Sequence, residues 1–294
     1  MYRFTTISFP ELGLEMDPVR QLSIGPLSIH LYGLIIGIGM ILAVTYGMRR
    51  AREFGLTEDH ILDGFLWVMP FAVLCARLYY CLFSWEMYRD NPISIFYIWE
   101  GGLAIYGGVL GAALGVILLC KIRKIDVRAF LDLVTIGFLI GQSLGRWGNF
   151  FNREAFGAET ESFLRMGLYN AYTGETTYHH PTFLYESLWN AVGFVLLHFL
   201  SKRRKYDGQV ALGYVAWYGL GRALIEGLRT DSLYIPGTGI RVSQLLAAAS
   251  CGIAVLLLVY NAMKNRNPEN LFVNRVKRST EENNHKPEGD TENG

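Results

Sequence analysis

The chain has 294 residues, of which 51% are hydrophobic, 14% aromatic and only 18% charged. Soluble domains average about a quarter charged residues, so this composition excludes an ordinary soluble protein of this length. The formal net charge of +1 argues against a nucleic-acid partner, which would need a basic surface to meet phosphates. The charges are bunched, as at 48–52 and 202–205, with long apolar runs between them, which is typical of a polytopic membrane protein.

The first 23 residues form a polar N-terminal segment. They carry Glu11, Glu15, Asp17 and two prolines, and so lack the basic and apolar regions of a signal peptide. Seven later segments approach the roughly 20 apolar residues that cross about 30 Å of hydrocarbon. They cover about 29–48, 61–83, 103–119, 129–147, 183–200, 209–228 and 242–263. We therefore predict an all-α polytopic membrane protein whose seven-helix membrane domain spans residues 24–263.

Basic residues in alternate loops predict the orientation of these helices. Lys and Arg concentrate at 49–52, 121–128 and 202–205, while the other connections are poorer in them. Short basic loops stay in the cytoplasm, so the N-terminus is expected outside and the C-terminus inside. This topology places the polar stretch 158–180 outside, as a small head. The tail at 264–294 is dominated by Asn, Glu, Lys and Gly, and we expect it to be disordered and dispensable for the chemistry.

The four cysteines lie in or beside apolar segments. They have no C-x-x-C spacing and no neighbouring histidine at ligand spacing, so structural disulfides and zinc sites are not expected. The residues are Cys75, Cys81, Cys120 and Cys251.

The most informative stretch is 141–157, where an apolar segment reaches its outer end and becomes polar. Its polar residues are Arg146, Asn149, Asn152, Arg153 and Glu154. Arg146 and Asn149 are three positions apart and so share a helix face. A charge at the bilayer centre costs about 2.5–3.5 kcal/mol on insertion scales, so such residues usually face a cavity and have a function. Snorkelling to the interface explains one such residue better than it explains the whole group.

A second polar cluster lies near the outer end of the sixth predicted span. Arg222 and Glu226 are four positions apart, and their mutual neutralisation within one helix is the simplest explanation for them. The span that carries Arg146 runs in the same direction, so both outer ends reach the same leaflet. We therefore expect Arg146, Arg222 and Arg229 to converge. Planar guanidinium groups suit phosphate oxygens, which they bind in pairs of hydrogen bonds.

Three further segments point to the same side of the membrane. The glycines of 101–108 permit close backbone approach at the mouth of the third span, although such glycines are common in membrane helices. Glu186 lies inside the fifth span, where a carboxylate needs a partner or a proton. Tyr32 lies near the outer end of the first span, where an interfacial aromatic belt is an adequate alternative to a function.

Together these residues resemble the signature of bacterial prolipoprotein diacylglyceryl transferases. The matching string is Gly145-Arg-Trp-Gly-Asn-Phe-Phe-Asn-Arg-Glu-Ala-Phe-Gly157. Supporting motifs occur in the same order at 31–33, 99–108, 180–181 with 185–186, and 221–222 with Glu226 and Arg229. The resemblance covers about 24–262, nearly the whole membrane portion.

The resemblance implies an activity. It is the transfer of the sn-1,2-diacylglyceryl group from phosphatidylglycerol to the lipobox cysteine of a preprolipoprotein signal peptide, in the bacterial cell membrane. A thioether forms and glycerol phosphate is released. No metal or organic cofactor is expected, and the nucleophilic thiol arrives on the substrate.

The resemblance and the charge pattern together predict the site. The predicted catalytic residues are Arg146, Arg222, Glu154, Asn149 and Tyr106. The predicted substrate-binding residues are Arg146, Tyr32, Asn149, Asn152, Gly157, Glu186, Glu226 and Arg229. Some family members have a histidine where this chain has Tyr106, and a phenol with a pKa near 10 is a poor base at neutral pH. The proton acceptor is therefore open among Glu154, Glu226 and Tyr106.

Two other classes of function fit parts of the pattern. An anion or solute transporter also uses glycine-rich breaks and intramembrane arginines, but it needs polar groups along the whole path, and here they crowd one end. A structural membrane protein has no need of Arg, Asn and Glu together at depth.

Overall fold

The computed structural model describes residues 4–25, 27–230, 233–235, 237–264 and 266–284. The chain forms two compact units. The first contains 1–43 and 134–268, and the second contains 44–133 and 269–294. The division falls within two long helices, α1 (Leu31–Arg50) and α5 (Val127–Asn152).

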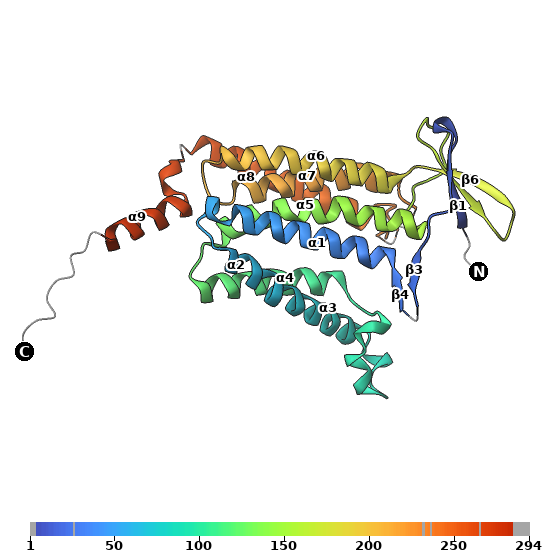
Figure 1. The fold of residues 1–294 in the computed structure, drawn as a ribbon, viewed down its shortest axis with the longest axis horizontal. Coiled ribbons are helices and arrows are strands. Elements are labelled where there is room, and N and C mark those ends of the chain that lie inside the picture. The colour runs from blue at the N-terminus through green and yellow to red at the C-terminus, as the bar shows by residue number, and fades with distance from the viewer. Residues whose placement is uncertain (1–3, 26, 231–232, 236, 265, 285–294) are drawn as a thin grey trace, which may run out of the picture. The chain divides into compact units, whose positions relative to one another are not determined.

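The first unit is a helix bundle built on the N-terminal part of α1, most of α5, and three later helices. These are α6 (Thr182–Lys202), α7 (Gln209–Ile225) and α8 (Val242–Met263), and α7 packs on both of its neighbours (Figure 1). Small residues permit this packing, as is usual in membranes. A Cβ on Gly219 of α7 would lie 2.8 Å from the Ala247 carbonyl oxygen of α8.

Two tryptophans join α6 to α7. The indole rings of Trp189 and Trp217 stack at 4.4 Å, and each Nε1 donates to the backbone carbonyl of the other residue at 3.0 Å. The rings lie where side chains of Gly193 and Gly221 would otherwise be, since a Cβ at either glycine would overlap an indole. This reciprocal contact sets the register of the two helices. Glu186 of α6 and Arg222 of α7, which belong to the polar cluster described below, lie beside it.

A small antiparallel sheet lies at one end of this bundle (Figure 1). Its strand order is β2 (Leu14–Met16), β1 (Phe4–Phe9), β5 (Met166–Asn170) and β6 (Glu175–His179). The N-terminal segment therefore pairs with the head segment that follows α5. A hairpin of β3 (Gln21–Ile24) and β4 (Leu27–His30) then leads into α1. The chain is mostly helical as predicted, but the sheet was not predicted from the sequence, because its short strands pair across about 160 residues.

The sheet is held to the bundle by apolar packing and by Arg153. Ile7 and Leu168 of the sheet share a buried cluster with Phe150 of α5 and Phe183 of α6. The buried Arg153 side chain donates to the Thr5 carbonyl at 2.6 Å and the Pro18 carbonyl at 2.8 Å, and pairs with Asp17. Arg153 therefore anchors the N-terminal segment.

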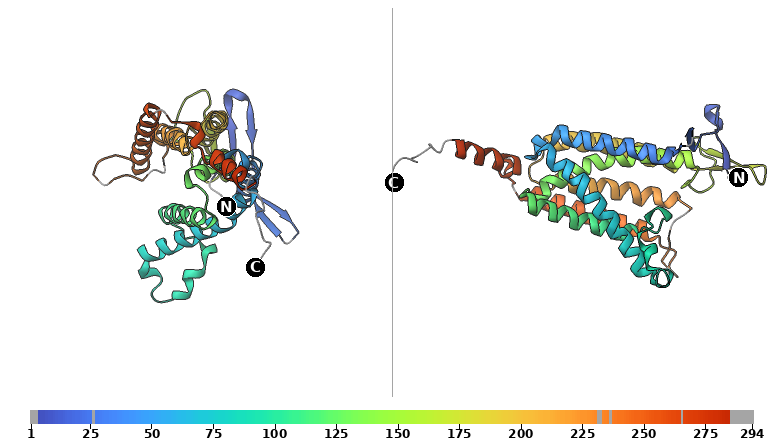
Figure 2. Two further views of the ribbon diagram at one scale, coloured as in Figure 1. Left: turned by 90° about the vertical axis from the view of Figure 1, so that its left-hand side faces the viewer. Right: turned by 60° about the horizontal axis from the view of Figure 1, so that its bottom comes forward.

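The second unit begins in the last turns of α1 and contains η2 (Ala51–Phe54), α2 (Glu58–Asp63) and η3 (Gly64–Val68). These lead into α3 (Met69–Phe83), followed by short turns at Trp85–Met87, Pro92–Phe96 and Ile98–Glu100, and then α4 (Ile105–Arg123). α3 and α4 pack together, and the right-hand view of Figure 2 shows them side by side. Gly107 and Gly111 leave the space for this contact, since a Cβ at either would overlap α3.

Arg77 organises the segment between these two helices. It is 4% exposed, and it donates to the backbone carbonyls of Ser94, Ile95, Tyr97, Gly101 and Gly102 at 2.7–3.4 Å. Gly101 and Gly102 have φ of 89° and 69°, which turns the chain toward the guanidinium. The glycine-rich motif thus supplies backbone carbonyls that accept hydrogen bonds from a buried arginine.

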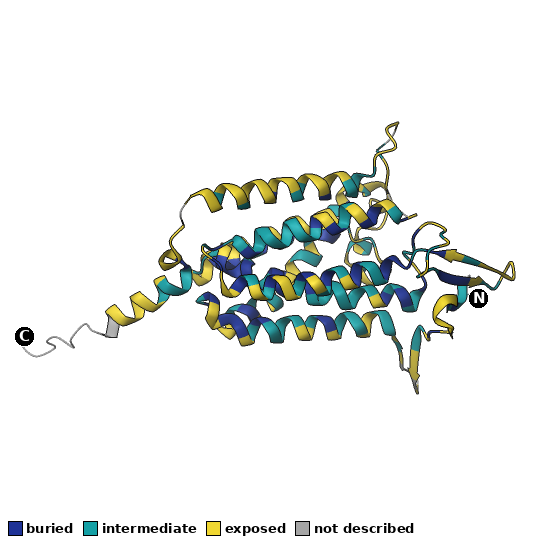
Figure 3. Ribbon diagram, turned by 90° about the horizontal axis from the view of Figure 1, so that it is seen from above, coloured by how far each residue is buried: buried dark blue, intermediate teal, exposed yellow. Residues whose placement is uncertain are grey.

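Six helices of the described chain are long and apolar enough to cross a membrane: 31–54, 58–83, 105–123, 127–152, 182–202 and 242–263. Each overlaps a predicted span. The remaining predicted span corresponds to α7, which has 17 residues. Exposed positions run along the helices in Figure 3, and many are large apolar residues, as expected for surfaces that face lipid. The chain is a multi-pass membrane protein.

The expected disorder of the tail is wrong for part of it. α9 (Phe272–Asn284) is helical, and Leu271 before it is 7% exposed. Arg275 pairs with Asp126 at 2.9 Å, and the backbone of Val273 lies against Gly55. The tail has low overall hydropathy, but it contains a few apolar and basic residues. Their contacts are sufficient to hold α9 against the rest of the second unit. Residues 285–294 lie outside the described part of the chain.

Candidate active site

Glu186 is the centre of a buried ionic cluster in the first unit. Its carboxylate forms an ion pair with Arg146 of α5 at 2.6 Å, and it accepts a hydrogen bond from Arg229, just after α7, at 3.0 Å. Arg222 of α7 lies 3.5 Å from both of its oxygens. The predicted convergence of the three arginines is confirmed, and a carboxylate from a fourth segment holds them together.

Glu226 holds the other side of Arg222. The Arg222 Nη2 lies 2.7 Å from Glu226 Oε2, so the predicted i,i+4 pair is present. The Ser243 hydroxyl donates to the other oxygen of Glu226. Arg241 donates to the backbone carbonyl of Glu226 at 2.6 Å and to that of Arg229 at 3.3 Å. The start of α8 thus fixes the end of α7 and the turn after it, which carry Arg222 and Arg229.

A second network runs from Arg146 toward the end of α5. Arg146 Nη1 donates to Asn149 Oδ1 at 3.3 Å, and Asn149 Nδ2 donates to Glu154 Oε1 at 3.0 Å. Asn152 Nδ2 donates to the same oxygen at 3.3 Å. Arg153 and Ala155, which flank Glu154, both have φ of 55°, a left-handed conformation that costs energy for residues with side chains. The four predicted polar residues therefore form one chain of contacts, and a strained turn aims Glu154 into it.

Gly157 and Tyr32 act through packing. A Cβ on Gly157 would lie 2.7 Å from His180 Cβ and 2.9 Å from the Leu228 carbonyl oxygen, so no side chain fits there. Gly157 pairs with Arg229 through a backbone bridge and donates to the His180 carbonyl at 2.9 Å. The Tyr32 ring lies over Gly148 of α5, where a Cβ would overlap it. The close approach at Gly157 joins the loop after α5 to the backbone that carries Arg229.

Charge and access divide the cluster into two kinds of residue. Three guanidinium groups meet two carboxylates, so the cluster has one more positive than negative charge. The side chains of Arg146 and Arg222 are 23% and 20% exposed, whereas those of Arg229, Glu186 and Glu226 are 9%, 6% and 2% exposed. An incoming anion can reach the first two arginines, and the other three residues are placed to hold them.

The structure does not bring every predicted residue into one unit. Tyr106 lies in the first turn of α4, in the second unit, and is 51% exposed. The residue pattern did not predict Arg241, Ser243 or the supporting role of Arg77. Arg77 and Arg241 carried a signal, since each is a lone basic residue in or beside an apolar segment. Ser243 carried none.

A metal centre has no evident ligands in the described part of the chain. No three residues of the His, Cys, Asp and Glu types gather there at positions that would hold an ion. The candidate site consists of guanidinium, carboxylate and amide groups.

These features define an integral membrane protein with a largely buried ionic cluster that has one positive charge in excess. A family model described as prolipoprotein diacylglyceryl transferase matches residues 20–260. The chain belongs to this family.

Relatives of the chain carry the same description. The phosphatidylglycerol–prolipoprotein diacylglyceryl transferase of Enterococcus faecalis is 44% identical over 257 residues, covering 85% of this chain and 91% of the relative. Those of Bacillus velezensis and Streptococcus suis are 40% and 42% identical, covering 86% and 88% of this chain and 95% and 97% of theirs. The similarity therefore extends over nearly the whole length of these relatives.

Proposed function

We propose that this chain transfers the diacylglyceryl group of phosphatidylglycerol to the lipobox cysteine of a preprolipoprotein signal peptide. The observation that carries the proposal is the convergence of Arg146, Arg222 and Arg229 on Glu186. The anionic lipid supplies the phosphate that the excess positive charge requires, and family membership supplies the class of reaction.

Arg146 and Arg222 bind the lipid phosphate in this proposal. The side chains of both are partly exposed, while that of Arg229 is almost fully covered. Asn149 orients Arg146, and Tyr32 and Asn152 line the same end of α5. Gly157 keeps the loop close to Arg229. Glu186, Glu226 and Arg229 act by holding the two phosphate-binding arginines in place.

The reaction displaces a phosphate ester by sulfur. The cysteine sulfur forms a bond to the glyceryl carbon that carries the phosphate, and the C–O bond breaks with its electron pair moving to the phosphate oxygen. Negative charge therefore grows on the leaving glycerol phosphate. Preorganised guanidinium groups stabilise that charge at the moment it develops, which is the usual source of large rate gains in such sites. The thiol proton must leave to a base.

Glu154 is the best placed acceptor for that proton. It is exposed, unlike Glu186 and Glu226, and two asparagine amides fix one of its oxygens. The positive field of the arginines also favours the thiolate of the incoming cysteine, whose free pKa is about 8.5. Tyr106 remains an alternative acceptor.

The proposal includes a topology. α7 crosses the membrane as the seventh span, despite its 17 residues. The basic loops face the cytoplasm of a bacterial cell, and the sheet with its N-terminal strands lies outside. The polar cluster then opens at the outer leaflet, where the lipid enters from the side and the signal peptide presents its cysteine.

The test is reconstitution of the purified protein with phosphatidylglycerol and a peptide that carries one lipobox cysteine. Mass spectrometry should show one added diacylglyceryl group. Arg222→Ala should lower the rate by about 10²–10³-fold, the usual cost of losing one donor to a developing anion. Arg266→Ala, beyond α8, is the matched control and should leave the rate unchanged. Full transfer by a folded Arg222→Ala protein would refute the phosphate role, and no added mass with the wild-type protein would refute the function.

A further inference from the structure

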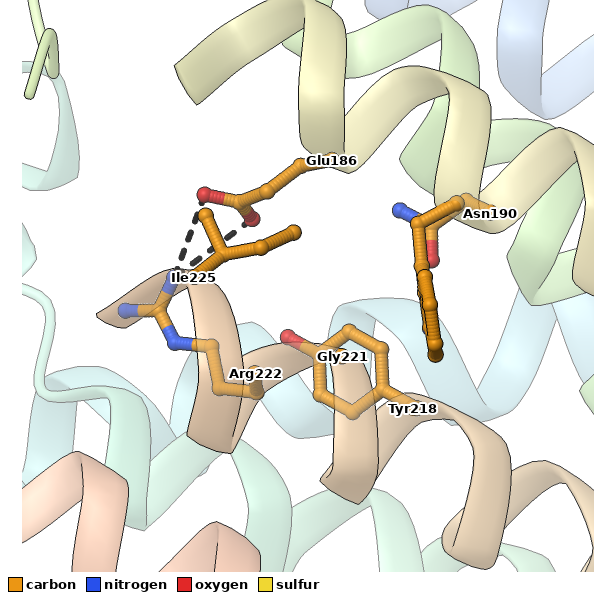
Figure 4. A pocket seen from close by; sticks show the side chains of 7 residues that line it. Glu186, Asn190, Tyr218, Gly221, Arg222 and Ile225 are labelled. Atoms are coloured by element: carbon orange, nitrogen blue, oxygen red, sulfur yellow. Dashed lines mark hydrogen bonds and ion pairs between the residues drawn. The ribbon is translucent and has the colours of Figure 1, made fainter. Parts of the chain in front are cut away.

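A small pocket lies between α6 and α7, beside the ionic cluster. It is lined by Glu186, Trp189, Asn190, Tyr218, Gly221, Arg222 and Ile225. Its cavity volume is about 10 Å³, which is room for one water-sized group such as a single hydroxyl and not for a whole headgroup or an acyl chain. Figure 4 shows the Asn190 amide and the Tyr218 ring facing the same space as the Glu186–Arg222 pair. The pocket therefore continues directly from the proposed phosphate site.

Asn190 is the unexplained residue of this pocket. It is 3% exposed, and no protein group among the described residues hydrogen-bonds its side-chain amide. Buried amides are nearly always hydrogen-bonded, because leaving one unpaired costs about 1–3 kcal/mol. The Asn190 amide faces only the pocket, so its hydrogen-bond partner must be a group that enters the pocket. The Tyr218 hydroxyl adds a second donor and acceptor to the same space.

The chemistry of the lining selects a neutral polar group. An amide donates through nitrogen and accepts through oxygen, which matches a hydroxyl that both accepts and donates. A cationic headgroup is disfavoured, because Arg222 forms one wall and the Glu186 carboxylate is already shared by three guanidinium groups. Trp189 and Ile225 make part of the lining apolar, and the space between them and the polar groups admits one small group. A single hydroxyl of a glycerol end has this size and polarity.

We infer that Asn190 is a specificity-determining residue that hydrogen-bonds a hydroxyl of the lipid's terminal glycerol. The inference rests on the proposed function and identifies the part of the headgroup that binds in this pocket. With the phosphate on Arg146 and Arg222, the hydroxyl donates to Asn190 Oδ1 and accepts from Nδ2. A lipid with the same phosphate but no hydroxyls leaves the buried amide unpaired, and that penalty is the source of the discrimination.

The test compares two lipids that differ only in these hydroxyls. Wild-type and Asn190→Leu proteins are reconstituted with phosphatidylglycerol or with phosphatidylpropanol of the same acyl chains, in a phosphatidylcholine carrier. Transfer to a lipobox peptide gives kcat/KM for each lipid. The wild-type protein should prefer phosphatidylglycerol by about tenfold, the size of one well-made hydrogen bond. Asn190→Leu should keep its rate with phosphatidylpropanol and lose the preference.

Controls separate this inference from the proposed function. Asn261→Leu on α8 makes the same chemical change away from the pocket and should keep the wild-type preference. Where Asn190→Leu fails to insert, Asn190→Ala gives the same ratio of rates. An unchanged preference, or an equal fall with both lipids, would overturn the headgroup role and leave the transferase proposal intact. If the wild-type protein transfers neither lipid, both the headgroup inference and the transferase proposal would be overturned.

Discussion

Replacing Glu186 by Gln tests whether this carboxylate competes with substrate phosphate for the arginines. The wild-type cluster has three guanidinium groups and two carboxylates, so one positive charge is in excess, and the substitution raises the excess to two. Gln keeps the shape and one acceptor oxygen. It removes the charge that now holds Arg146 and Arg229 at 2.6 and 3.0 Å.

The loss should lower stability and strengthen anion binding at the same time. Removing one partner of a buried ion pair costs about 3–5 kcal/mol, and the remaining acceptor of Gln reduces this to about 2–4 kcal/mol. For a chain of this size that corresponds to a fall in Tm of about 5–15 °C. Freed guanidinium N–H groups should bind glycerol phosphate more tightly. Misplaced arginines should lower kcat by about 10–100-fold, because small errors in position are costly.

Thermal unfolding in detergent and product inhibition measure these two effects. Tm should fall in Glu186→Gln and partly recover when glycerol phosphate is added, while the inhibition constant of glycerol phosphate decreases. Glu161→Gln changes an exposed carboxylate of the head and should alter neither quantity. A lower kcat with unchanged product inhibition would refute the idea that Glu186 and phosphate share the same arginines.

Three other predictions concern packing, loop order and pH. Gly221→Ala places a methyl group into the Trp189 indole and should destabilise the protein by about 1–3 kcal/mol, measured as a lower Tm. Arg77→Gln removes most donors to five backbone carbonyls, so amide exchange over 92–102 should rise by about tenfold or more, measured by hydrogen exchange. Burial lowers the pKa of His179 below its ordinary value of 6.5, against the opposing effect of its bond to the Gly157 carbonyl. The neutral form is therefore favoured in the folded state, so the contribution of His179 to stability is complete above about pH 6.5 and is lost as the pH falls below it, which hydrogen exchange in β6 at pH 7.5 and 5 will show.

Each of these three predictions has a matched control. Gly252→Ala lies in open space on α8 and should be neutral or slightly stabilising. Arg89→Gln changes an exposed arginine of the same connecting segment and should leave exchange over 92–102 unchanged. His179→Gln does not titrate in this range and should abolish the pH dependence. Equal effects in variant and control would contradict the packing and loop predictions, and an unchanged pH dependence in His179→Gln would assign it to another group.

Much of the bundle and part of the site followed from residue type and spacing. Apolar runs predicted the helices. A segment that crosses hydrocarbon needs about 20 apolar residues, and it must satisfy its backbone hydrogen bonds internally. The spacing of Arg146 with Asn149, and of Arg222 with Glu226, gave contacts within one helix that the structure contains. The motif order then identified the family, which the comparisons confirm.

The missed features depend on contacts between distant parts of the chain. The sheet pairs β1 with β5, and short polar strands give little local signal for such a pairing. The tail helix α9 is ordered by contacts with Gly55 and Asp126, which a low average hydropathy conceals. Composition therefore predicted disorder where a few docking contacts decide otherwise.

The sequence by itself placed arginines and glutamates in or beside apolar helices, and it determined which helices carry them. Only the tertiary structure decided which carboxylate they share, because Glu186 meets Arg146, Arg222 and Arg229 across three different segments. The same holds for Asn190, which has no hydrogen-bond partner among the described residues, a fact that is visible only once α6 and α7 are packed with their tryptophans in contact. Local spacing fixes which side chains share a helix face, whereas the geometry between helices fixes which of them can hold a ligand together.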